Sequence, residues 1–251
     1  MAMDATATAG NRGEKIRSDC YVRIRPRNSG RIAIQLDSKV ASVFGEQIRQ
    51  QVRQVLKEMG VKHAEVELED TGALPFVIAA RLEAAIRDLH IPHKSYIPGM
   101  IPQNLYETDR KRFRLSRLYL PGNTPRLMLN AGIHHPDGII LDLEDSVAPD
   151  KKAEARLLVR NALCQVDFYG AERMVRINQL PRRLEDLEDI VPHHVHLILI
   201  PKCETGKQVQ LVEDRVRDIL RAADQERNIY FMPIIESCLG VENAFEIASS
   251  S

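Results

Sequence analysis

Charged side chains follow several short apolar runs in the second half of the chain. Glu144 and Asp145 follow one run, Arg176 ends the next, and Glu236 ends the last. Carboxylates accept protons and bind cations, and the planar arginine side chain binds carboxylates through paired hydrogen bonds. The sequence therefore predicts a polar site, suited to an anionic and oxygen-rich substrate, built from residues that follow apolar segments.

The apolar runs predict strands that are buried on both faces. They lie within residues 115–120, 138–145, 174–178, 196–204 and 229–236. Predicted helices at 151–164, 184–190, 205–223 and 239–248 alternate with these strands. This alternation is typical of βαβ units, in which parallel strands end at one rim of the sheet. Ligands bind at that rim in α/β barrels and in open α/β sheets.

Five strands in residues 112–251 are too few for a closed barrel, which has eight. We therefore expect an α/β fold, a (β/α) TIM-type barrel truncated after five strands, and a sequence that is a piece of a longer protein. An open sheet is the alternative. We favour truncation over an open sheet, because in an open sheet the last strand would leave an apolar edge uncovered.

Residues 1–92 predict a small α+β domain that precedes the barrel. Alternating residues at 20–25 and 31–36 indicate two strands that could pair as a hairpin. Helical spacing runs from Val40 to Met59, a strand follows at 64–69, and a second helix covers 74–89. Residues 93–111 are rich in proline and charge and are expected to form a linker.

The composition excludes several classes of function. The 35 basic residues balance 35 acidic ones, so the chain lacks the net positive charge of a nucleic-acid-binding protein. No apolar run approaches the roughly 18 residues of a membrane span. The four cysteines lack the spacing of a zinc site or disulfide framework. These features favour a cytoplasmic protein with reduced thiols.

Five ordered motifs in the second half resemble those of the citrate lyase β-subunit family within the HpcH/HpaI aldolase group. They are YLPGNTP at 119–125, LDLEDSVAP at 141–149, VRIN at 175–178, IPKCE at 200–204 and PIIES at 233–237. The first half is similar to the acyl carrier protein, or γ subunit, of citrate lyase. That likeness rests on Ala9-Gly10, Ser18-Asp19, Val43-Phe44-Gly45 and the segments 70–74 and 80–83.

The resemblance implies a carbon–carbon lyase that cleaves a 3-hydroxyacyl thioester. The expected reaction converts citryl-carrier to acetyl-carrier and oxaloacetate with the help of Mg²⁺. Glu236 matches the family's metal-binding glutamate, and the family's second metal ligand, an aspartate, would lie beyond Ser251. Arg176 matches the substrate-binding arginine. Glu144 and Asp145 would pair with it or orient metal-bound water, and Gly122 would let the backbone approach a thioester.

The carrier resemblance implies a phosphoribosyl-dephospho-CoA group on a serine just ahead of an aspartate. Ser18, before Asp19, is the nearest candidate, and residues 9–17 would form a flexible arm. Implied partners are acyl thioester and keto acid substrates, the α (transferase) subunit of citrate lyase and further copies of the chain in a homo-oligomer. No nucleic-acid or membrane partner is expected.

Plainer interpretations stand beside these. Glu236 could simply pair with Lys202, Arg176 could be a structural partner of Glu144, and Ser18 could be an ordinary loop serine. His193, His194 and His196 precede a strand and are interpreted as solvated loop residues. At the level of function, one alternative is a malyl-CoA-type lyase or thioesterase that acts on free CoA esters. Another is an inactive carrier and assembly module with an incomplete barrel.

Overall fold

The computed structural model describes residues 5–180 and 184–250. The chain divides into two compact units. One comprises Met1–Gly99 with Thr124–Arg126, and the other comprises Met100–Asn123 with Leu127–Ser251. No helix in the described ranges has the length and apolar character needed to cross a bilayer.

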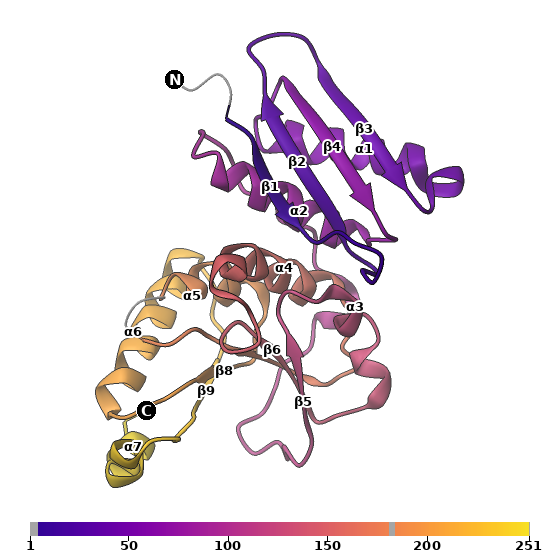
Figure 1. The fold of residues 1–251 in the computed structure, drawn as a ribbon. Helices are drawn as coiled ribbons and strands as arrows, with labels where there is room; N and C mark the ends of the chain where they lie inside the picture. Colours follow the sequence, from indigo (N-terminus) through magenta and orange to yellow (C-terminus); the bar gives the residue numbers. More distant parts are fainter. Residues whose placement is uncertain (1–4, 181–183, 251) are drawn as a thin grey trace. The chain divides into compact units, whose positions relative to one another are not determined.

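The first unit is a four-stranded sheet with two helices on one face (Figure 1). Its strands are β1 (Ala7–Gly10), β2 (Cys20–Pro26), β3 (Ile32–Ser38) and β4 (Ala64–Asp70), in the order β1-β2-β4-β3. The helices are α1 (Ala41–Glu58) and α2 (Pro75–Asp88). Apolar residues at helical spacing on α1, such as Ile48, Val52 and Val55, are buried against this sheet and α2.

The predicted hairpin between β2 and β3 is wrong. β4 lies between them, antiparallel to β2 and parallel to β3. The connection from β3 to β4 runs through α1, which is long enough to return the chain in parallel and to cover the apolar face. The expected flexible arm at 9–17 is also shorter, because Ala9 and Gly10 belong to β1 and pair with β2.

The second unit contains a five-stranded sheet whose order, β5-β6-β7-β8-β9, follows the sequence, and every neighbouring pair is parallel. The strands are β5 (Arg117–Pro121), β6 (Gly138–Asp142), β7 (Glu172–Arg176), β8 (Leu197–Ile200) and β9 (Tyr230–Pro233). The prediction of an α/β fold with a parallel sheet is confirmed. Its completion to a barrel stays a prediction.

Helices connect and follow these strands. They are α3 (Pro125–Met128), α4 (Lys152–Gln165), α5 (Glu185–Ile190), α6 (Gly206–Ala222), α7 (Cys238–Glu242) and α8 (Ala244–Ala248), with short 3-10 turns η1 (Pro102–Asn104), η2 (Ala131–His134), η3 (Pro149–Lys151) and η4 (Val191–His193). The single helix predicted at 239–248 is two short ones. Thr205 starts α6 through a capping box with Gln208, so the loop after β8 ends at a defined residue.

The segment expected as a linker makes specific contacts over residues 100–111. Asn104 is fully buried, and its amide donates to the carbonyl oxygens of Leu163 and Val166. The Tyr106 hydroxyl donates to the carbonyl oxygen of Ala171. These hydrogen bonds fix the segment to the second unit, ahead of β5.

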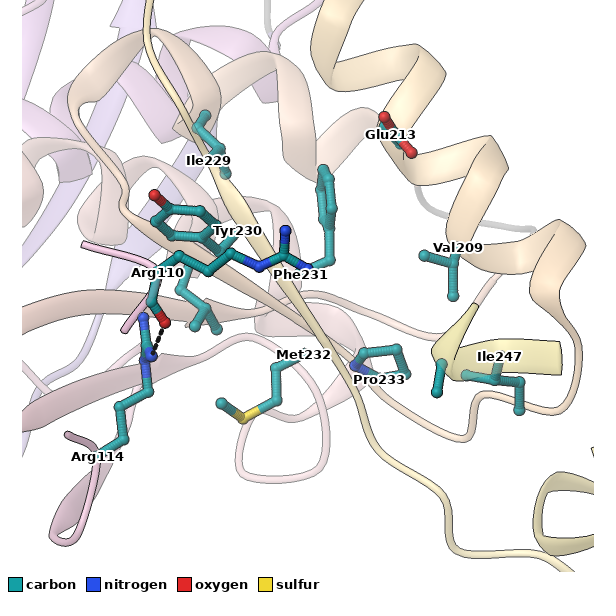
Figure 2. Close-up of a pocket in the computed structure, with 12 residues that line it drawn as sticks. Arg110, Arg114, Val209, Glu213, Ile229, Tyr230, Phe231, Met232, Pro233 and Ile247 are labelled. Atoms are coloured by element: carbon teal, nitrogen blue, oxygen red, sulfur yellow. Dashed lines mark hydrogen bonds between the residues drawn. The ribbon is translucent and has the colours of Figure 1, made fainter. Parts of the chain in front are cut away.

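A cavity of about 370 Å³ lies along β9 (Figure 2). Apolar residues of β9 line it together with Val209 and Ile247. Arg114, at its margin, is held by the buried carboxylate of Glu172 at 2.5 and 2.7 Å. Arg110 and Glu213 also line the cavity, so its walls combine apolar side chains with charged ones.

Candidate functional site

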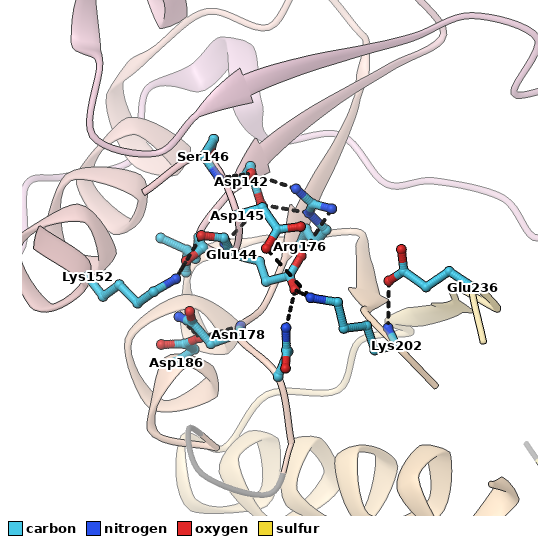
Figure 3. A network of polar contacts seen from close by, with 12 residues as sticks. Asp142, Glu144, Asp145, Ser146, Lys152, Arg176, Asn178, Asp186, Lys202 and Glu236 are labelled. Atoms are coloured by element: carbon cyan, nitrogen blue, oxygen red, sulfur yellow. Dashed lines mark hydrogen bonds and ion pairs between the residues drawn. The ribbon is translucent and has the colours of Figure 1, made fainter. Parts of the chain in front are cut away.

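Four charged residues gather at the carboxyl ends of adjacent strands (Figure 3). Asp142 is the last residue of β6 and Arg176 the last of β7, and the parallel register places them side by side. Lys202 follows β8 and Glu236 follows β9. The parallel sheet therefore creates a polar cluster at the rim where ligands bind in α/β proteins.

Asp142 and Arg176 form a paired ion bridge. Arg176 Nε and Nη2 donate to the two Asp142 carboxylate oxygens at 2.7 and 2.8 Å. The backbone N–H groups of Glu144 and Ser146 donate to the same carboxylate at 2.9 and 3.1 Å. The Arg176 guanidinium also lies 5.3 Å from the centre of the Tyr119 ring.

The pKa values of both partners favour the ionised pair. Burial alone would raise the pKa of Asp142, but hydrogen bonds from Arg176 and Ser146 bring it below its ordinary value. Hydrogen bonding to Asp142 raises the pKa of Arg176 further above its ordinary range. Asp142 is therefore a permanent anion that fixes the orientation of Arg176.

Glu144 is a buried carboxylate between two cations. Its Oε1 lies 3.1 Å from Lys202 Nζ and accepts a hydrogen bond from Gln179 Nε2 at 2.8 Å. Its Oε2 lies 3.1 Å from Arg176 Nη1 as an ion pair, although the angles do not make a hydrogen bond. The exposed Asp145 lies farther out, 3.7 Å from Lys202 Nζ.

Lys202 connects this cluster to Glu236. Its backbone N–H donates to Glu236 Oε1 at 3.0 Å, while its ammonium faces Glu144 and Asp145. Hydrogen bonding to Glu144 raises the pKa of the ammonium, which stays charged at neutral pH. The backbone of Lys202 has a φ of 47°, in the left-handed region. This conformation costs a non-glycine residue about 1–3 kcal/mol and is common at functional sites.

The structure thus brings Arg176, Glu144 and Glu236 to one rim, with Asp145 at its margin. It also differs from expectation. The Nε and Nη2 groups of Arg176 bind Asp142, and Asp145 pairs with Lys202, while substrate binding by Arg176 stays a prediction. Glu236 does contact Lys202, as the plainer interpretation held, but through the backbone N–H.

Gly122 packs against the backbone of Asp142, at the end of β6. Its N–H donates to the carbonyl oxygen of Asp142 at 2.8 Å, and a Cβ at this position would lie only 2.6 Å from that oxygen. The absence of a side chain therefore permits the chain after β5 to pack against the end of β6. The observed close approach is to the protein backbone, so contact with a thioester stays a prediction.

Asp142 and Gln179 were not predicted as site residues, and Lys202 entered only as a possible partner of Glu236. Asp142 stands between the apolar residues Leu141 and Leu143, so its immediate neighbours do not mark it as part of a polar site. The available signal was its position, because Asp142 and Arg176 each end a predicted strand and would be neighbours in a parallel sheet. Gln179 carried no comparable signal, since its role depends on the path of the loop after β7.

The three histidines before β8 differ from the prediction to different degrees, since His193 and His194 are half-buried and His196 is fully buried. His196 is buried, its Nδ1 accepts from the Arg173 N–H at 3.2 Å, and its Nε2 lies 2.9 Å from the Tyr106 carbonyl oxygen. Burial lowers the pKa of His196 to about 3 and that of His193 to about 4, so both are neutral. Both precede β8, at the opposite end of that strand from Lys202; His196 belongs to the buried core, and His193 is half-buried at the end of η4.

Ser18 lies in the first unit, where its surroundings are well defined. Its φ is 55° and its N–H donates to the carbonyl oxygen of Thr71 at 3.1 Å. The neighbouring Asp19 is buried and accepts two hydrogen bonds from Arg81, at 2.9 and 3.1 Å. The candidate serine therefore sits in a strained loop beside a fixed ion pair.

The residues that would hold Mg²⁺ offer only a partial fit. Glu236 is exposed, and one of its oxygens accepts from Lys202 N–H. Within residues 5–180 and 184–250, no group of three or more potential ligand residues is close enough to hold a metal ion. Mg²⁺ is often held by one or two carboxylates, with waters and substrate oxygens in the other positions. Glu236 would supply one such carboxylate and leave the other positions to water and substrate oxygens.

A parallel α/β sheet with charged side chains gathered at its carboxyl rim defines the class of α/β proteins whose ligands bind at that rim. Residues 115–251 match the family described as HpcH/HpaI aldolase/citrate lyase, and the chain belongs to this family. Residues 5–89 match the acyl-carrier family described as malonate decarboxylase delta subunit. The chain is therefore a fusion of a carrier-like domain with a domain like the citrate lyase β subunit.

Curated relatives carry two kinds of name. Citrate lyase subunit beta of Leuconostoc mesenteroides subsp. cremoris is 37% identical over 146 residues, which cover 57% of this chain and 48% of that protein. L-malyl-CoA/beta-methylmalyl-CoA lyase of Cereibacter sphaeroides is 36% identical over 140 residues, covering 54% and 44%. The chain spans about half the length of the curated relatives it matches.

Among solved structures, the citrate lyase beta subunit of Mycobacterium tuberculosis aligns with a TM-score of 0.44 and 26% identity, covering 57% of each chain. A structure of the same organism's protein with magnesium and acetoacetate aligns with a TM-score of 0.43 and 26% identity, covering 55% of this chain and 52% of that chain.

Proposed function

We propose that this protein is a carbon–carbon lyase that cleaves a 3-hydroxyacyl thioester, converting citryl-carrier to acetyl-carrier and oxaloacetate. The observation that carries the proposal is the cluster of Arg176, Lys202 and Glu144 at the carboxyl rim of the parallel sheet. The family membership and the carrier-like first half support the same reaction. On this proposal residues 1–92 are the carrier domain, 93–111 connect the domains, and 112–251 are the lyase part of a (β/α) barrel.

The reaction is a retro-Claisen cleavage. The hydroxyl group on the substrate's quaternary carbon loses its proton to a base and becomes the ketone of oxaloacetate. The bond between that carbon and the thioester α-carbon breaks, and its electron pair forms the enolate of the acetyl thioester. The enolate then takes up a proton at carbon. Negative charge develops first on the alkoxide oxygen and then on the thioester oxygen, so preorganised cations lower the barrier.

Arg176 and Lys202 would supply these cations. Asp142 accepts from Nε and Nη2 of Arg176, so substrate oxygens would bind at the remaining Nη hydrogens, next to Glu144 and the Lys202 ammonium. Glu144 holds both cations in place, because its Oε1 lies 3.1 Å from Lys202 Nζ and its Oε2 lies 3.1 Å from Arg176 Nη1. Fixing cations in advance avoids the cost of reorganising them during the reaction.

When Mg²⁺ is bound, it would act as a Lewis acid on substrate oxygens, and Glu236 is the residue we propose to hold it. With one protein carboxylate, affinity for the ion alone should be weak. Glu236 is positioned for this role by the Lys202 N–H at 3.0 Å.

Ser18 is the proposed attachment point of a phosphoribosyl-dephospho-CoA group. Its left-handed backbone and the fixed Asp19 beside it support a specialised role for this loop. The proposed partners are an α (transferase) subunit that loads the thioester and other copies of this chain. We also propose that the protein acts in the cytoplasm.

A second candidate is cleavage of free CoA esters, as in a malyl-CoA lyase. The observation that favours it is the 36% identity to the named malyl-CoA lyase, close to the 37% identity to citrate lyase subunit beta. On this alternative the first unit would not carry an acyl group.

The experiment is a release assay with the full chain. Citryl-carrier and malyl-CoA are supplied separately with Mg²⁺, and the keto product is measured for wild type, Arg176→Lys and Asp145→Asn. We expect Arg176→Lys to lose about 100-fold in rate or more, since lysine cannot keep paired bonds to Asp142 and also bind substrate. Asp145→Asn, which removes a charge from the margin of the same cluster, should stay within about threefold of wild type.

Protection of the buried Cys203 thiol from labelling verifies that each variant is folded. Release from citryl-carrier alone supports the leading proposal, and release from malyl-CoA alone supports the second. No release from either substrate, or full activity of Arg176→Lys, would contradict the assignment of the rim as a lyase site.

A further inference from the structure

The first unit contains a groove that the lyase site does not use. It has a volume of about 530 Å³, within the roughly 300–1,000 Å³ typical of small-molecule sites. It lies between α1 and the segment that leads into α2. Its lining residues are Val40, Phe44, Gln47, Ile48, Gln51, Gln54, Gly72, Ala73, Leu74, Pro75, Ile78 and Tyr96.

The lining has a distinct chemical character. It contains no charged side chain, and its polar groups are chiefly glutamine amides. The amide nitrogens of Gln51 and Gln54 already donate to the Pro75 carbonyl oxygen and to Glu58, which leaves their carbonyl oxygens to accept from a ligand. Phe44 and Leu74 are 52% and 45% exposed, which leaves apolar surface available to a ligand in the groove. The groove suits a neutral, flexible ligand with amide N–H groups.

One end of the groove is connected to Ser18 through Thr71 and Gly72. The Ser18 N–H donates to Thr71 O, and Thr71 in turn donates from both N and Oγ1 to the Asp19 carbonyl oxygen, at 3.0 and 2.7 Å. Gly72, the following residue, lines the groove. The strained Ser18 loop is thus fastened to the residue that precedes the groove.

We propose that this groove binds the pantetheine part of the prosthetic group attached at Ser18. Pantetheine is neutral, flexible and largely aliphatic, and it carries two amides, which match the apolar walls and glutamine carbonyl oxygens. The charged phosphate and citryl groups find no partner among the lining residues and would stay outside. Bound in this way, the arm is sheltered from solvent between catalytic cycles. The inference rests on the proposed carrier function of the first unit.

The test uses S-acetyl-pantetheine as a probe, added to the full chain that lacks the prosthetic group. Amide NMR signals of the groove residues should shift saturably. Phe44→Asp places a charge in the groove and should weaken binding about tenfold or more. Val43→Asp is the matched control, because Val43 is the neighbouring residue on α1, is 66% exposed and is absent from the groove lining. It should bind as wild type does.

A second measurement uses the modified chain. The rate at which a bulky reagent labels the arm's thiol should rise several-fold in Phe44→Asp and stay unchanged in Val43→Asp. Absence of saturable probe binding, or equal binding by the two variants, would overturn the inference. If the carrier proposal is wrong, mass analysis will show an unmodified Ser18 peptide. Even then, the probe titration tests whether the groove binds pantetheine.

Discussion

Replacing Asp142 with asparagine should destabilise the second unit by about 3 kcal/mol. Asp142 is 1% exposed, and two charge-assisted hydrogen bonds at 2.7 and 2.8 Å tie it to Arg176. Removing one partner of a buried pair costs about 3–5 kcal/mol, because the other charge is left uncompensated. Arg176 keeps Glu144 at 3.1 Å and a side chain that is 15% exposed, so the lower end of this range applies.

The pH dependence of this effect has a definite sign. The pKa of Asp142 in the folded protein lies below its ordinary value, because the hydrogen bonds from Arg176 and Ser146 outweigh burial. The unfolded chain, with an aspartate pKa of about 3.9, therefore binds the proton more readily. The stabilisation is present above that pH and is lost as pH falls through the folded pKa. The difference between wild type and Asp142→Asn should stay constant from about pH 5 to about pH 8 and shrink below about pH 4.

The buried thiols of the chain provide the assay. Cys164 and Cys203 report unfolding of the second unit and Cys20 reports the first, so labelling in urea followed by peptide mass analysis measures each unit separately. Asp145→Asn is the control, because this exposed residue is only 3.7 Å from Lys202 Nζ, and it should change stability by less than about 0.5 kcal/mol. Equal effects of the two substitutions would refute the reasoning.

Two further outcomes follow from the geometry. Gly122→Ala should destabilise the second unit by about 1–3 kcal/mol, because the added Cβ would lie 2.6 Å from the carbonyl oxygen of Asp142. Gly99→Ala is the control and should be neutral, because no atom lies within 4 Å of the added Cβ. Urea unfolding of both variants measures the difference. The second unit should also lose stability as pH falls below about 6.5, the ordinary histidine pKa. Burial holds the pKa of His193 at about 4 and that of His196 at about 3, so the unfolded chain binds more protons in that window, by up to about 1.4 kcal/mol per pH unit for each residue. A thiol-protection profile that is flat between about pH 7 and about pH 5 would contradict this.

Much of the second unit could be predicted from the sequence because its strands are short apolar runs between turn residues. Their parallel order could also be predicted, because a helical segment separates each strand from the next and returns the chain to the same end of the sheet. The first unit was harder. β2 and β3 alternate as hairpin strands do, and only the later strand β4, inserted between them, decides the pairing. Such long-range pairing leaves no mark in the local pattern.

The site was foreseen in outline and not in its connections. Position at strand ends predicted that Arg176, Glu144 and Glu236 would share a rim. The sequence could not show that Arg176 forms its paired hydrogen bonds with Asp142. That choice depends on which of the carboxylates of Asp142, Glu144 and Asp145 is best aligned with the guanidinium. The partner of Glu236 also depends on the backbone, since the left-handed turn at Lys202 directs the N–H toward Glu236 and the ammonium toward Glu144.

The most direct measurement follows the Ser18 peptide by mass in a citryl-loaded full chain. The chain is purified from cells that make the prosthetic group, loaded, and sampled after Mg²⁺ is added. Our proposal predicts a citryl adduct on Ser18 that converts to the acetyl adduct as oxaloacetate appears, with little conversion in Arg176→Lys. An unmodified Ser18, or a citryl adduct that persists while wild-type protein remains folded, would contradict it.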